Sequence, residues 1–95
     1  MKTFDVINYK IGENEEIAID SFCGQESYVL PDRPSNDSQI TIFDIGNNLS
    51  KNPCTIKCNN HKIDGEIKDL ILTINGSKLK LKYNVFEGYK SYFFW

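Results

Sequence analysis

Three thiols and one imidazole are the sharpest candidates in this sequence for holding a metal ion or for nucleophilic catalysis. Cys23, Cys54, Cys58 and His61 together form the Cys₃His set of a structural zinc site. If the segment from Cys54 to Cys58 is a strand, its four steps separate the thiols by about 13 Å, whereas zinc ligands lie about 2.3 Å from the metal. We therefore expect no bound metal, and we expect Cys54, Ile56 and Cys58 to form one inward face.

Other patterns that carry catalysis are weak in this sequence. His61 is the only histidine, and the polar residues around it predict an exposed turn rather than a base beside a nucleophile. The adjacent Glu15 and Glu16 lack the apolar setting that a catalytic acid needs, and no glycine-rich phosphate loop is present. We predict that the protein is not an enzyme and uses no cofactor.

Charge is divided unequally along the chain, although the net charge is only −2. Residues 1–50 contain nine acidic and three basic side chains, and residues 51–95 contain four acidic and eight basic ones. Such a molecule attracts partners of opposite charge, unless strands from the two halves interleave and cancel the field. We predict a partner-binding surface in the acidic half. Its members are Glu13, Glu15, Glu16, Asp20, Phe22, Glu26, Tyr28, Asp32 and Asp37.

The second half contains a row of lysines at alternate positions. Lys78, Lys80 and Lys82 share one face of a predicted strand. With an aromatic side chain such as Tyr92 nearby, this face has the composition of a platform for single-stranded nucleic acid, or of a small-molecule site. The pI of about 5.3 and the single arginine favour lysines that are simply solvated or that protect an edge strand. A nucleic-acid partner is therefore not expected, and this face is the alternative binding surface.

The composition indicates that sheets position these residues. Twelve isoleucines stand against a single alanine, Ala18, and isoleucine favours strands whereas alanine favours helices. Short alternating segments separated by turn residues predict an all-β fold, a small antiparallel β-sandwich or open barrel of seven to eight short strands. At most one short helix is expected, and residues 65–72 are its best candidate.

The C-terminal half has the clearest local signals. Asn75-Gly76 separates two apolar segments and predicts a tight hairpin in which residues 70–74 pair with residues 78–83. A further turn is expected to lead into a last strand within residues 89–95. This segment is strongly aromatic, so we expect its side chains to contribute to the core.

The chain length suits one domain, residues 1–95. The apolar runs are too short to cross a bilayer, and the sequence begins without the apolar core of a secretion signal, so we expect no membrane and a cytoplasmic location. The odd number of cysteines agrees with a reducing compartment. The abundance of isoleucine, lysine and asparagine suggests the codon bias of an AT-rich bacterial or phage genome.

These features favour a binding protein over an enzyme. We expect a protein-binding inhibitor of the immunity type, which neutralises a basic toxin or nuclease, or a phage protein that inhibits host defence, through its acidic surface. Its partner would be a basic protein. The alternative is a small-molecule or single-stranded nucleic-acid binding module that uses the lysine row, and a structural or oligomerisation module is a third reading.

Overall fold

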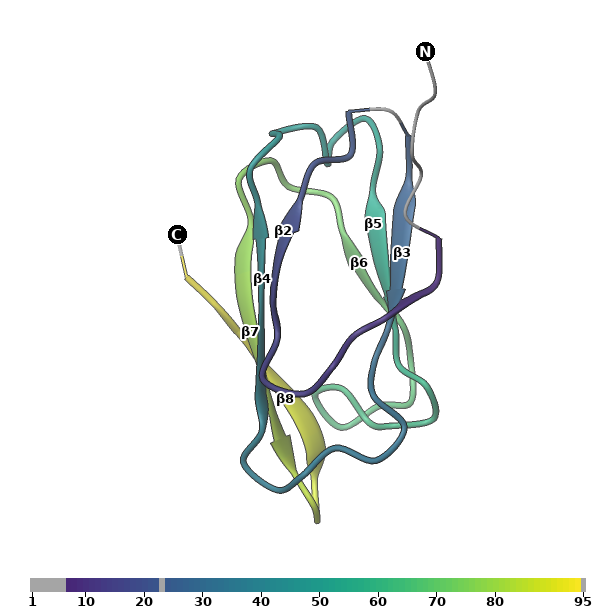
Figure 1. The fold of residues 1–95 in the computed structure, drawn as a ribbon, viewed down its shortest axis with the longest axis vertical. Coiled ribbons are helices and arrows are strands. Elements are labelled where there is room, and N and C mark those ends of the chain that lie inside the picture. Colours follow the sequence, from purple (N-terminus) through teal and green to yellow (C-terminus); the bar gives the residue numbers. More distant parts are fainter. Residues whose placement is uncertain (1–6, 23, 95) are drawn as a thin grey trace.

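The computed structural model of the protein describes residues 7–22 and 24–94. Within these ranges the chain forms eight short strands and no helix (Figure 1). The strands are β1 (Tyr9–Lys10), β2 (Glu16–Ile19), β3 (Glu26–Val29), β4 (Gln39–Asp44), β5 (Cys54–Lys57), β6 (Leu70–Leu72), β7 (Lys78–Asn84) and β8 (Gly88–Phe93). No helix in the described residues has the length and apolar character needed to span a membrane.

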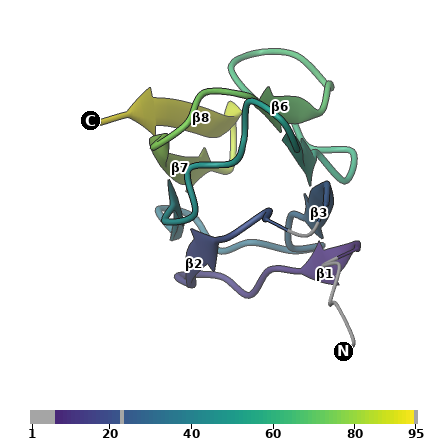
Figure 2. The ribbon, with the colours of Figure 1, turned by 90° about the horizontal axis from the view of Figure 1, so that it is seen from above.

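The strands form two four-stranded sheets that face each other (Figure 2). One sheet has the order β1-β3-β5-β6 and the other the order β2-β4-β7-β8, which confirms the predicted small β-sandwich. The chain changes sheet after β1, β2, β3, β4 and β6. Because sheet neighbours are often not consecutive in sequence, three pairs are parallel: β1–β3, β2–β4 and β3–β5. The sheets are therefore mixed rather than wholly antiparallel.

The turn at Asn75-Gly76 connects the two sheets and does not close a hairpin. Gly76 has the positive φ of 77° that such a turn requires, but β6 and β7 lie in different sheets. The predicted pairing of residues 70–74 with residues 78–83 is therefore wrong. A tight turn sets the local reversal of the chain, whereas burial decides which sheet each strand joins. Asp44 anchors the turn, because its Oδ2 accepts a hydrogen bond from the Gly76 N–H at 2.9 Å.

The last strand pairs antiparallel with β7, as predicted. Its core residue is Tyr89, which is 1% exposed, whereas Tyr92, Phe93 and Phe94 are 43–47% exposed. The expectation that these three aromatic residues pack in the core is wrong, because the end of β8 extends away from the opposite sheet (Figure 2). Trp95 lies outside the described residues.

Alternating side chains fill the space between the sheets. Ile17 and Ile19 of β2 and Leu79 and Leu81 of β7 are buried, while their sequence neighbours are exposed or half-buried. On one side of the sandwich, residues 62–64 run beside β8. These contacts place the β7–β8 turn at one end of the molecule, where it meets two other connections.

Candidate functional site

Three connecting segments meet at one end of the sandwich, and we call this region the loop end. The segments are residues 12–15, 31–38 and 84–88. Ser35 Oγ donates a hydrogen bond to Glu13 Oε1 at 3.2 Å, and the Val85 N–H donates to Asn36 Oδ1 at 2.9 Å. Side-chain hydrogen bonds thus hold the three segments together.

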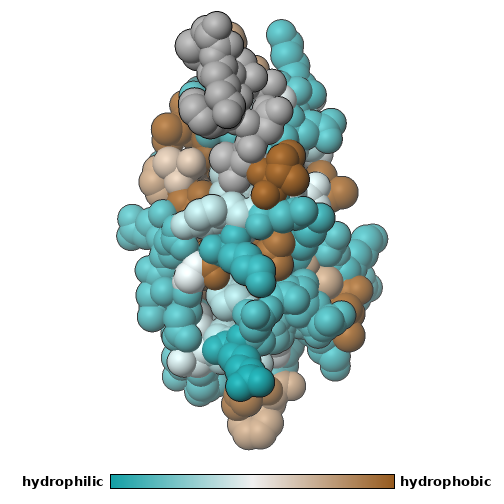
Figure 3. Space-filling view, turned by 45° about the vertical axis from the view of Figure 1, so that its right-hand side comes forward, coloured by the Kyte–Doolittle hydropathy of each residue, from teal (hydrophilic) through white to brown (hydrophobic). Residues whose placement is uncertain are grey.

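The β7–β8 turn exposes two apolar side chains. Val85 is 57% exposed and Phe86 is 90% exposed. The turn is nevertheless ordered, because Asn84 Oδ1 accepts hydrogen bonds from the N–H groups of Phe86 and Glu87 at 2.8 and 3.1 Å, and Gly88 supplies a positive φ of 83°. Figure 3 shows hydrophobic side chains projecting at the lower end of the molecule, where this turn lies in Figure 1.

Carboxylates dominate the charge of the loop end. Its only basic residue is Arg33, and its acidic residues are Glu13, Glu15, Asp32, Asp37 and Glu87. Asn59 Nδ2 donates a hydrogen bond to Asp32 at 2.7 Å, and this bond, together with the charge of Lys10, holds the pKa of the Asp32 carboxyl below its ordinary value. The loop end therefore presents an exposed aromatic ring among acidic side chains.

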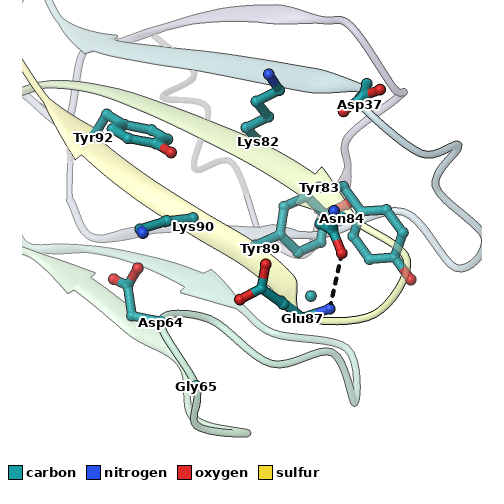
Figure 4. A pocket seen from close by; sticks show the side chains of 11 residues that line it. Asp37, Asp64, Gly65, Lys82, Tyr83, Asn84, Glu87, Tyr89, Lys90 and Tyr92 are labelled. Carbon is teal, nitrogen blue, oxygen red and sulfur yellow. Dashed lines mark hydrogen bonds between the residues drawn. The ribbon is translucent and has the colours of Figure 1, made fainter.

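An open pocket of about 560 Å³ lies between the loop end and the outer side of the β7–β8 pair (Figure 4). Asp37 and Glu87 line it together with Lys82, Lys90 and Tyr92. Its charges are of both signs, so the pocket marks the border between an acidic region and a basic region.

His61 closes the turn at Asn59-Asn60, because its N–H donates to the carbonyl oxygen of Cys58 at 3.0 Å, but its ring is half-buried in an aromatic cluster. Its Nε2 donates a hydrogen bond to the carbonyl oxygen of Pro31 at 2.9 Å, which requires the proton to reside on this nitrogen. Its ring lies edge-on to Tyr83 and Tyr89, with centroids 5.7 and 5.8 Å away. Burial raises the pKa of the Tyr89 hydroxyl, which has no hydrogen-bond partner among the described residues. These contacts give His61 a packing role.

The described cysteines face the core. Cys54 and Cys58 are free thiols, 0% and 8% exposed, and Ile56 lies buried between them, as predicted. Burial raises the pKa of the Cys54 thiol to about 12, so this thiol stays protonated at neutral pH. Among the described residues no three His, Cys, Asp or Glu side chains lie close enough to hold a metal ion. Cys23 lies outside these residues.

The structure divides the nine residues of the predicted acidic surface among four places. Glu13, Glu15, Asp32 and Asp37 lie at the loop end, and Glu16 lies on the outward face of β2. Asp20 and Phe22 follow the other end of β2 and belong to the opposite end of the sandwich.

The remaining two predicted contact residues, Glu26 and Tyr28, are not on the surface. They are 7% and 4% exposed, and the Tyr28 hydroxyl donates a hydrogen bond to Glu26 Oε1 at 2.7 Å. Burial and this bond raise the pKa of Tyr28. The pair is buried together because each side chain satisfies a polar group of the other, so the expectation that they contact a partner is corrected.

Sequence reasoning missed Val85 and Phe86. The sequence does indicate that they are exposed. Val85 and Phe86 are apolar residues in the turn between Asn84 and Glu87-Gly88, where chain reversal prevents their burial. Lys90 was also missed, because its place beside the lysine row depends on the pairing of β7 with β8.

Comparison with known proteins supports the fold. No family model matches the chain, and no curated protein matches it. A chain in a solved structure described as "Structure of a chaperone-substrate complex" superposes with a TM-score of 0.58 at 13% identity. The match covers 96% of this chain and 14% of that chain, so the likeness is to a small part of a larger protein and concerns the fold alone.

Proposed function

We propose that this protein is an inhibitor that binds a basic protein, such as a toxin or nuclease, through its loop end. The exposed Phe86 ring on an ordered turn is the observation that supports this proposal. Single exposed apolar side chains are common, but Val85 and Phe86 are adjacent on this turn, and contiguous exposed apolar surface marks sites of protein–protein contact. Aromatic residues at the centre of interfaces contribute a large share of binding free energy.

The charge around Phe86 supports a basic partner. Carboxylates at the rim of an interface accelerate association with a positively charged surface, while a central apolar contact slows dissociation. Asp37 and Glu87 are exposed and lie on either side of the β7–β8 turn. Phe86 is thus the aromatic contact residue in the proposed interface, in place of Phe22 and Tyr28 of the predicted acidic surface.

One further observation agrees with this proposal. The buried free thiols of Cys54 and Cys58 support a reducing compartment, the cytoplasm of a bacterial or phage-infected cell.

The proposal is tested by isolating the partner with tagged protein and measuring binding of the purified pair by biolayer interferometry. Phe86→Ser is expected to weaken binding at least about 30-fold, the factor that corresponds to loss of a hot spot of about 2 kcal/mol. A double variant, Asp37→Lys with Glu87→Lys, should slow association and reduce its dependence on salt. If the partner has an enzymatic activity, a saturating amount of this protein should suppress it.

Matched controls lie at the opposite end of the sandwich. Phe22 is 75% exposed, so Phe22→Ser removes a similar ring, and Asp20→Lys makes the charge change of either single substitution in the double variant. Both should leave binding unchanged. Weaker binding by these controls with full binding by Phe86→Ser would place the interface at the other end, and a partner with an acidic contact surface would contradict the proposal.

A further inference from the structure

The lysine row lies on an interior strand. β7 pairs with β4 on one side and with β8 on the other, so Lys78, Lys80 and Lys82 do not protect a sheet edge. The edge-protecting role predicted from the sequence is therefore wrong. These lysines lie at the middle of an exposed sheet face, where no pairing with another sheet needs to be prevented.

Strand register surrounds the lysines with aromatic rings. Directly paired residues share a face of a sheet, and Lys80 is paired with Tyr92. Lys78 is paired with Phe43 on β4, and on its other side its carbonyl accepts a hydrogen bond from the Phe94 N–H at 2.9 Å. Phe43 is half-buried, while Tyr92 and Phe94 are 47% and 43% exposed.

The same register adds a fourth lysine and leaves the face strongly basic. Lys90 is paired with Lys82. Along the outward positions of the four strands the only acidic residue is Glu16. None of the four ammonium groups forms an ion pair within the part of the chain that the structure describes. We call this surface the lysine face; its residues are Phe43, Lys78, Lys80, Lys82, Lys90, Tyr92 and Phe94.

We propose that the lysine face binds single-stranded nucleic acid. Lysines at alternate strand positions are about 6.6 Å apart and form a track that a chain of phosphates follows in extended form. Tyr92 and Phe94 offer rings beside this track, on which unpaired bases stack. An acidic protein segment would use the charge but not the rings, and the bases of a duplex are paired and stacked, so they are not free to stack on these rings.

The proposal goes beyond the protein-binding role and depends on other residues, so either one can fail alone. Contacts between these lysines and phosphates release counterions, which predicts binding that weakens as the salt concentration rises. The carboxylates near Lys82 and Lys90 place the stronger part of the site at Lys78 and Lys80, beside Tyr92 and Phe94.

Fluorescence anisotropy with a labelled dT20 oligonucleotide at 50 mM salt tests this proposal. The triple variant Lys78→Ala, Lys80→Ala, Lys82→Ala should lose at least tenfold in affinity and reduce the salt slope by about 2, since each phosphate contact contributes about 0.7. Tyr92→Leu keeps every charge and should lose about tenfold through lost stacking.

A matched control keeps the net charge of the triple variant. Lys51→Ala, Lys57→Ala, Lys68→Ala removes three lysines outside the lysine face and should bind as the parent does. Circular dichroism and melting temperature verify that all variants are folded. Absence of dT20 binding, equal loss in the control, or equal binding of polyglutamate with no effect of Tyr92→Leu would each overturn the proposal.

Discussion

Asn84 Oδ1 accepts a hydrogen bond from the backbone N–H of Phe86 at 2.8 Å. The turn is therefore ordered by this bond and not by burial of its side chains. Asn84→Ala removes the acceptor for two amides and should lower the free energy of unfolding by about 1–2 kcal/mol. Phe86→Ser removes no intramolecular packing and should change it by less than about 0.5 kcal/mol. Urea unfolding followed by circular dichroism measures both.

Those two variants also distinguish a docking residue from a structural one. If Phe86→Ser destabilises the protein as much as Asn84→Ala does, then the ring packs against the domain in solution. In that case it is not available to a partner, and the proposed binding surface loses its anchor.

Two glycines with similar φ angles provide a test of how closely residues 62–64 pack against β8. Gly88 (φ 83°) and Gly65 (φ 89°) both occupy the left-handed region. A Cβ at Gly88 would lie 2.6 Å from the carbonyl oxygen of Lys62, whereas a Cβ at Gly65 would meet nothing within 4 Å. Gly65→Ala should therefore cost only the backbone strain, about 1–2 kcal/mol.

Gly88→Ala should cost clearly more, because residues 62–64 must also move away from β8. The difference between the two melting temperatures measures the contribution of this packing. Equal losses would show that residues 62–64 are not held against β8. Asp64, which lines the pocket together with Lys90, would then be free to move.

Side-chain alternation was sufficient to predict the faces of the strands but not their partners. Ile17, Ile19, Leu79 and Leu81 are inward because period-2 patterns require one face to be buried. Asn75-Gly76 also forms the expected turn, yet it joins two sheets, because a turn motif contains no information about which distant strand satisfies the backbone of each neighbour.

The same distinction applies to the candidate sites. The shared face of Lys78 and Lys80 follows from their spacing alone, but the position of Tyr92 beside them depends on a pairing register. In the segment that contains Glu26 and Tyr28, either set of alternate residues could face the core. The sequence therefore left open which set is buried. The hydrogen bond between the two side chains resolves this choice, and such a bond is visible only in three dimensions.

Stability should decrease in alkali through Cys54. An ordinary thiol has a pKa of about 8.5, whereas burial raises the pKa of Cys54 to about 12. The folded state therefore retains a proton that the unfolded state releases. The stabilisation is complete below pH 8.5 and is lost as the pH rises toward 12, with a slope of at most about 1.4 kcal/mol per pH unit.

Urea unfolding between pH 7 and pH 10 measures this slope. Cys54→Ala removes the group and should flatten the decline, whatever its effect on stability at pH 7. If the variant and the parent decline in parallel, the Cys54 thiol does not titrate differently in the folded protein, and its burial is less complete than the structure indicates.

Replacing tyrosine by phenylalanine should change the free energy of unfolding in opposite directions at Tyr28 and Tyr89. Both rings are buried, but the Tyr28 hydroxyl donates a hydrogen bond to Glu26, whereas the Tyr89 hydroxyl has no partner within residues 7–22 and 24–94. Tyr28→Phe should lower the free energy of unfolding by about 1–3 kcal/mol, because it removes a buried hydrogen bond to an acidic side chain. Tyr89→Phe removes a desolvated hydroxyl without breaking a bond and should raise the free energy of unfolding by about 1 kcal/mol. Both values come from urea unfolding at pH 7, and a loss of stability in Tyr89→Phe would mean that this hydroxyl binds a water molecule or a ligand beside His61.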